Sequence, residues 1–206
     1  MLELTNSALD LGLVTGLQFA PTLIFSIYGG VLADRFDKRK LLAITNAGAG
    51  LVSLVLGILV ITQTVTISHV YVLAATLGLF NAIDGPIRAS FTSELVGKSD
   101  IANAISLNSA NFNAGRLIGP AVSGLLIAAF GTGPSFLINA ITYVAMLGAL
   151  GALRKNELHL SEKQLTRAKF SDAFVYLGSR LDIQIVMLTV FATATFGMNY
   201  QIFNAL

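Results

Sequence analysis

Residues 41–61 read LLAITNAGAGLVSLVLGILVI, an apolar stretch without a charged side chain. A helix needs about 20 consecutive apolar residues to cross the hydrocarbon layer of a membrane, and this stretch has that length. Four basic residues come shortly before it: Arg35, Lys38, Arg39 and Lys40. The following segment, Thr62–His69, contains no Lys or Arg. The sequence therefore predicts a transmembrane helix with one basic end.

Five other stretches have the same apolar character and a similar length. They are approximately Leu11–Leu32, Val70–Arg88, Ala110–Phe130, Pro134–Leu153 and Ile183–Leu206. Only 12% of the 206 residues are charged and 54% are hydrophobic, whereas about 25% of residues are charged in soluble domains. Hydrocarbon offers no hydrogen-bond partners to bare backbone groups, so each span is expected to be helical. The predicted fold class is all-α, a polytopic bundle of about six transmembrane helices.

Basic and non-basic connectors alternate along the chain. The connectors after the first, third and fifth spans hold twelve of the 13 Lys and Arg residues, whereas Thr62–His69 and Gly131–Gly133 hold none. Cytoplasmic loops are enriched in Lys and Arg. We therefore expect a multi-pass protein of the plasma membrane with its basic loops in the cytoplasm. This orientation places the N-terminus outside and leaves the last span without a flanking anchor, which predicts that the chain is a fragment.

The long fifth connector predicts a division of the chain into three parts. Residues 1–153 are expected to form a transmembrane bundle of five spans, and residues 183–206 the first helix of a second bundle. Residues 154–182 would be a cytoplasmic linker between the bundles. One helical face of this linker is apolar and predicts a short helix on the membrane surface. It consists of Phe170, Ala173, Phe174 and Leu177.

The first basic connector carries the pattern Gly30-x-x-x-Asp34-Arg35, followed by a basic pair. This pattern resembles the signature loop between the second and third helices of major facilitator superfamily transporters, although Asp37 stands where many members have Gly. The resemblance implies a conformational latch, in which Gly30 lets a neighbouring helix approach closely. Asp34 would face a helix N-terminus in the other half of the transporter, and Arg35 and Arg39 would pair with acidic groups. The alternative is a turn that basic residues merely anchor.

The fourth span carries a second pattern, in which Gly115, Gly119 and Ser123 are spaced by four residues and Pro120 and Gly124 stand among them. It is similar to the Gly-Pro motif of the fifth helix in superfamily antiporters, and small residues at this spacing permit close helix packing. Plain packing, common to polytopic proteins, is the alternative. The two patterns together imply the second to seventh helices of a twelve-helix fold, on a drug/proton antiporter-like branch that includes macrolide and siderophore exporters.

Three ionisable residues are expected in or near the membrane, where charges are costly and usually paired. Asp84 and Arg116 each lie about six residues from the predicted cytoplasmic ends of their spans, which favours an ion pair between the two helices. A local pair between Asp84 and Arg88, with Arg116 reaching to the interface, is the alternative. We expect Asp84 to be a coupling or gating carboxylate. Polar residues on helical faces are the cavity-lining candidates: Gln18, Thr22, Asn81 and Asn113.

Several classes of function are disfavoured by the sequence. Cysteine is absent, and His69 and His159 are predicted on opposite sides of the membrane, so we expect no catalytic, cofactor or metal site. The basic residues are interpreted as topology signals and not as a nucleic-acid surface. The family resemblance implies proton-coupled efflux of a small amphipathic molecule or drug by alternating access, together with the missing C-terminal half of the same transporter. Uptake by the same fold, or a non-transporting scaffold or assembly protein, is the alternative.

Overall fold

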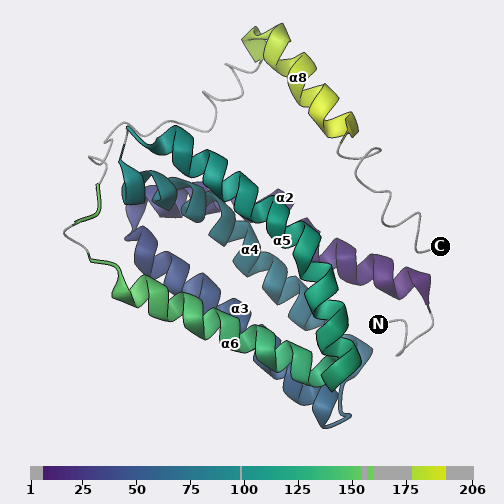
Figure 1. Ribbon diagram of the computed structural model, residues 1–206. Coiled ribbons are helices and arrows are strands. Elements are labelled where there is room, and N and C mark those ends of the chain that lie inside the picture. The colour runs from purple at the N-terminus through teal and green to yellow at the C-terminus, as the bar shows by residue number, and fades with distance from the viewer. Residues whose placement is uncertain (1–6, 98, 155–156, 160–177, 194–206) are drawn as a thin grey trace. The chain divides into compact units, whose positions relative to one another are not determined.

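The computed structural model describes residues 7–97, 99–154, 157–159 and 178–193. Within these ranges the chain forms helices and no strand (Figure 1). The helices are α2 (Ala8–Arg35), α3 (Lys38–Ile61), α4 (Ile67–Val96), α5 (Ile101–Phe130), α6 (Thr132–Ala152) and α8 (Leu181–Ala192). The predicted all-α fold is confirmed.

Five of the described helices, α2 to α6, are long and apolar enough to cross a membrane. They match the first five predicted spans and lie in one compact unit, Met1–Ser161. Helix α8 lies in a second unit, Glu162–Leu206, and its described part has 12 residues. The rest of the sixth predicted span and the apolar face of the predicted linker helix lie outside the described residues. The three-part division of the chain stays a prediction.

Helix α4 continues beyond the end expected for the third span. It has 30 residues and stops at Gly97, whose φ of 73° is a conformation that glycine adopts readily. Between Arg88 and this glycine, Thr92 Oγ1 donates to the backbone oxygen of Arg88 and so satisfies its own hydroxyl within the helix. The third predicted span, Val70–Arg88, therefore lies within α4, and the helix continues for eight residues past Arg88.

The helices of the first unit pack unevenly. Helix α2 packs chiefly against α4, while α3 lies against both α4 and α6. Glycines allow the close crossing of α2 and α4: a Cβ at Gly29 would lie 3.0 Å from the carbonyl oxygen of Ile83, and one at Gly78 would clash with the carbonyl oxygen of Gln18. Helix α5 touches α4 and α6 only lightly and has no buried residue.

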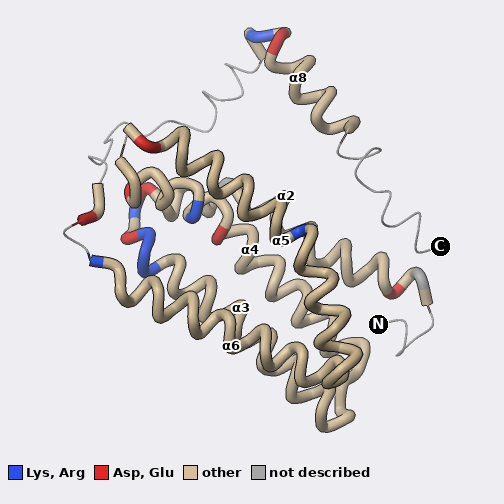
Figure 2. The backbone as a smooth tube through the Cα atoms, in the orientation of Figure 1, with Lys and Arg blue, Asp and Glu red and all other residues tan. Residues whose placement is uncertain are grey.

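Burial and charge are both arranged as a membrane-embedded bundle requires. Ala33, Leu42, Ile87, Phe91 and Leu150 form a small apolar core. Large apolar side chains elsewhere point outward, as lipid-facing surfaces require, and Leu23 is 82% exposed. Basic residues gather at the end of the bundle where α2 and α6 end and α3 begins, whereas the turns from α3 to α4 and from α5 to α6 carry no charge (Figure 2).

Candidate functional site

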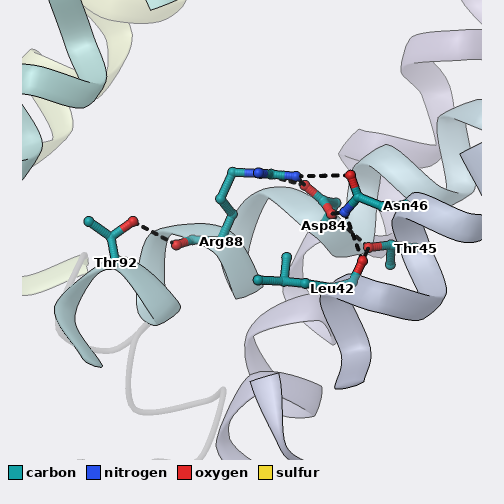
Figure 3. Close-up of polar contacts among 6 residues, drawn as sticks. All are labelled: Leu42, Thr45, Asn46, Asp84, Arg88 and Thr92. Carbon is teal, nitrogen blue, oxygen red and sulfur yellow. Dashed lines mark hydrogen bonds and ion pairs between the residues drawn. The ribbon is translucent and has the colours of Figure 1, made fainter. Parts of the chain in front are cut away.

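Asp84 of α4 stands at the centre of a polar cluster that joins two helices (Figure 3). From α3, Thr45 Oγ1 donates to Asp84 Oδ1 at 2.6 Å, and Asn46 Nδ2 donates to the same oxygen at 2.9 Å. From α4 itself, Arg88 Nε and Nη2 each lie 2.8 Å from Oδ2. All four contacts bring donor groups to the carboxylate oxygens of Asp84. Asp84 therefore links α3 to α4 through charge-assisted hydrogen bonds.

The cluster is buried on the α3 side and open on the other. Thr45 and Asn46 are buried, and Asn46 Nδ2 also donates to the backbone oxygen of Leu42 at 2.7 Å. The side chain of Asp84 is 17% exposed, whereas that of Arg88 is 42% exposed. The two opposite charges compensate one another, which lowers the cost of placing them in a membrane-spanning helix. Chemically, this arrangement can hold a fixed ion pair or release it when the carboxylate takes up a proton.

The favoured pairing of Asp84 with Arg116 is wrong, and the local pair of Asp84 with Arg88 is present instead. The Arg116 side chain is exposed, and its guanidinium carbon lies 6.0 Å from the ring centroid of Phe112 on its own helix. The reason lies in the packing: a residue four positions away on one helix is always within reach, whereas α5 touches α4 only lightly. Asp84 also lies twelve residues before the end of α4 at Val96 and not six.

The cavity-lining candidates occupy two different environments. Gln18 and Thr22 are half-buried on α2, while the apolar Phe19 between them is 62% exposed. In this part of α2 the two polar side chains are thus less exposed than the apolar one between them. Asn81 and Asn113 are exposed, and Asn113 Nδ2 donates to the backbone oxygen of Ser109 within α5. That these four residues line a transport cavity stays a prediction.

The latch residues lie at the end of α2 and the start of α3, and their role as a latch stays a prediction. Asp34 and Arg35 are exposed, and the described part of the chain offers neither of them an ion-pair partner. Arg39 Nη2 donates to the backbone oxygen of Gly151 at 2.6 Å, so it contacts a carbonyl and not an acidic group. A Cβ on Gly30 would meet no atom within 4 Å. The close approach occurs at Gly29 instead, because adjacent residues of a helix point about 100° apart.

An ion pair that the sequence analysis missed joins Lys38 at the start of α3 to Glu94 near the end of α4. Its side chains are only 12% and 9% exposed. The backbone oxygen of Glu94 also accepts a hydrogen bond from the backbone N–H of His159 at 2.8 Å. The sequence carried a signal for this pair. One residue is basic and begins a helix, and the other is acidic and lies near the end of the next helix. The start of one helix and the end of its antiparallel neighbour lie at the same end of a bundle.

The small-residue stripe of α5 has no neighbour in the part of the chain that the structure describes. A Cβ at Gly115, Gly119 or Gly124 would meet nothing within 4 Å, and Pro120 is exposed. The predicted packing role of this stripe therefore stays a prediction.

The sequence analysis did not single out Thr45 and Asn46. Both lie with Ala49 on the buried face of α3. Their spacing of three and four residues from this small residue was the available signal, because residues at that spacing share one face of a helix.

Comparison with known proteins places this geometry in context. Residues 1–202 match the model of a family described as transmembrane secretion effectors. The staphyloferrin A transporter of Staphylococcus aureus is 34% identical over 139 residues, which are 67% of this chain and 35% of that protein. The enterobactin exporter of Shigella flexneri is 29% identical over 150 residues, covering 71% of this chain and 36% of the exporter.

A further relative from Bacillus subtilis, an uncharacterized transporter of the major facilitator type, is 30% identical over 138 residues, 67% of this chain and 32% of its own length. The chain thus spans about a third of the length of the curated relatives it matches. All three carry names of transporters and none carries the name of an enzyme, which confirms the predicted class at the level of the family.

Proposed function

The chain belongs to the transmembrane secretion effector family of major facilitator transporters, and from this premise we propose that its parent protein exports a small amphipathic molecule. The substrate class we propose is a siderophore, ahead of a drug. This choice is supported by the names of two relatives, a staphyloferrin A transporter and an enterobactin exporter. Export would proceed across the plasma membrane by alternating access, with the basic loops in the cytoplasm and the remaining half of the transporter supplied by the same protein.

The ion pair of Asp84 and Arg88 carries the mechanistic part of the proposal. Uptake of a proton by Asp84 would remove the charge that attracts the guanidinium of Arg88 and the donors of Thr45 and Asn46. The contact between α3 and α4 would loosen, and Arg88 would be released toward its exposed side. A pair of this kind inside a membrane-spanning helix is suited to couple proton movement to a change of conformation. Asp84 is therefore the proposed coupling or gating carboxylate.

The basic loop is the proposed latch between the two halves. Lys38 and Arg39 fix the loop to α4 and α6 through Glu94 and the backbone oxygen of Gly151. Asp34, on the preceding turn, is exposed and has no ion-pair partner among the described residues, which suits a contact with another part of the transporter.

The function is tested by transport in membrane vesicles that contain the full-length protein. In inverted vesicles with an acidic interior, enterobactin or staphyloferrin A is expected to accumulate, and a protonophore should abolish the accumulation. Substitution Asp34→Asn in the latch should slow the same flux without lowering the amount of protein. Accumulation that persists after the gradient collapses would contradict proton exchange. Accumulation only in right-side-out vesicles would show uptake, and ethidium moving in place of both siderophores would contradict the substrate class.

A further inference from the structure

A hollow of about 320 Å³ lies between the start of α3 and the end of α6. Its two halves differ in chemistry. Arg39 and Lys40 of α3 line one part, whereas Ala43, Leu147 and Leu150 provide an apolar floor. The hollow is separate from the cluster around Asp84, which lies between α3 and α4.

The level of this hollow in the membrane follows from the length of α6. Its 21 residues give a helix of about 32 Å at 1.5 Å per residue, close to the hydrocarbon thickness of about 30 Å. The last turn of α6, which contains Leu150 and Gly151, therefore lies near the boundary between acyl chains and headgroups. When α6 crosses the hydrocarbon layer from end to end, the cationic part of the hollow lies at headgroup level and its floor lies at the level of the acyl chains.

The two cations of the hollow are available to an anion. Arg39 Nη2 donates to the backbone oxygen of Gly151 at 2.6 Å, which fixes the guanidinium beside the hollow and leaves its other N–H groups to donate elsewhere. Lys40 is exposed, and no carboxylate pairs with its ammonium group in the ranges that the structure describes. By contrast, Lys38 and Arg154 at the same end of the bundle are each paired with a glutamate.

The one acidic residue of the lining does not neutralise the hollow. Asp37 Oδ1 accepts a hydrogen bond at 3.2 Å from the backbone N–H of Lys40 and so caps the N-terminus of α3, where the helix dipole compensates a negative charge. The three charged lining residues, Asp37, Arg39 and Lys40, still sum to a net positive charge.

We propose that this hollow binds an anionic phospholipid of the cytoplasmic leaflet, with its phosphate between Arg39 and Lys40. Basic pockets between membrane helices at this level suit phosphate headgroups. An acyl chain would lie on Leu147 and continue past Val144, one helical turn deeper, which is 65% exposed. This continuous apolar path is the reason for choosing a lipid over a free phosphate, which would leave the floor of the hollow in contact with water.

The experiment is native mass spectrometry of the purified full-length protein with added phosphatidylglycerol, phosphatidylcholine or inorganic phosphate. Wild-type protein is expected to retain phosphatidylglycerol in preference to phosphatidylcholine. Lys40→Gln should lower this retention about fivefold, the effect of losing one basic residue near a membrane surface. Ala43→Phe should lower it as well by filling the floor. The matched control is Arg154→Gln, which removes a basic residue of the same end outside the hollow and should retain the lipid like the wild type.

Two results would overturn the proposal. Equal retention of phosphatidylglycerol by the wild type, Lys40→Gln and Ala43→Phe would show that the lipid binds elsewhere. Displacement of the lipid by inorganic phosphate at equal concentration would show a phosphate site that does not use the apolar floor. Membrane content and thermal stability of each variant are measured in parallel, and a double substitution, Arg39→Gln with Lys40→Gln, should abolish the preference for phosphatidylglycerol in protein that remains folded.

Discussion

At Asp84, a carboxylate inside a membrane-spanning helix accepts hydrogen bonds from four donor atoms, two on α3 and two on its own helix. Each donor reduces the cost of keeping the charge in this environment. Removal of the charge would therefore change three other residues at once. Arg88 would lose its counter-ion. Thr45 and Asn46 would donate to a neutral acceptor in place of a charged one.

Asp84→Asn is expected to lower transport at least tenfold while membrane content changes by less than about twofold. A tenfold loss corresponds to about 1.4 kcal/mol in the activation free energy of transport. This is less than the cost of leaving a fully buried charge unpaired, because the side chain of Arg88 is partly exposed. Flux in vesicles and immunoblotting measure the two quantities. Thr76→Val is the matched control, since Thr76 Oγ1 bonds only the backbone oxygen of Val72 on the same helix. Wild-type flux of Asp84→Asn across the whole pH range would contradict the coupling role.

At the scale of the element, much of the helix pattern follows directly from the sequence. Apolar length and alternating basic connectors were sufficient for the five described spans, because hydrocarbon thickness and backbone hydrogen bonding leave few other solutions. The end of α4 was not predictable in this way, since residues 89–96 are helical although half of their side chains are polar. Nor was the partner of Asp84, because a pair within one helix and a pair between helices fit the same sequence until the packing of α5 is known.

The neighbouring glycines of α2 provide a test at this scale. Gly29→Val is expected to lower the thermal unfolding temperature of the purified protein by several degrees, because the new side chain must displace the backbone of α4 near Ile83, an overpacking cost of about 1–3 kcal/mol. Gly30→Val is the matched control and should shift it far less, because a Cβ there meets no described atom. Fluorescence-detected size-exclusion chromatography after heating measures both. A larger loss for Gly30→Val would contradict the observed crossing of α2 and α4.

For the whole molecule, the most informative feature is that packing is concentrated in α2, α3, α4 and α6. Helix α5 has no buried residue, although its sequence carries both a small-residue stripe and polar residues. The chain covers about a third of the relatives it matches. The candidate latch was predictable as a pattern, but the contacts of Lys38 and Arg39 were not, because they depend on how α4 and α6 end relative to α3.

The orientation of the bundle can be tested because the chain contains no cysteine. In a cysteine-free full-length protein, Thr64→Cys is expected to react with an impermeant maleimide in intact cells. Phe36→Cys and Ser99→Cys should react only after the cells are opened, since they lie in the turns on the basic side. All three positions are exposed in the structure. Labelling of Phe36→Cys and Thr64→Cys from the same side would contradict the alternation of spans.

Glu94 is held at two points, by Lys38 through its carboxylate and by the backbone N–H of His159 through its carbonyl oxygen. The chain that leaves α6 is thus tied to the last turn of α4 at His159. This fixed point lies five residues beyond Arg154. At no more than about 3.6 Å per residue, five residues of extended chain could reach up to ~18 Å from that arginine, and the contact with Glu94 removes this freedom at His159.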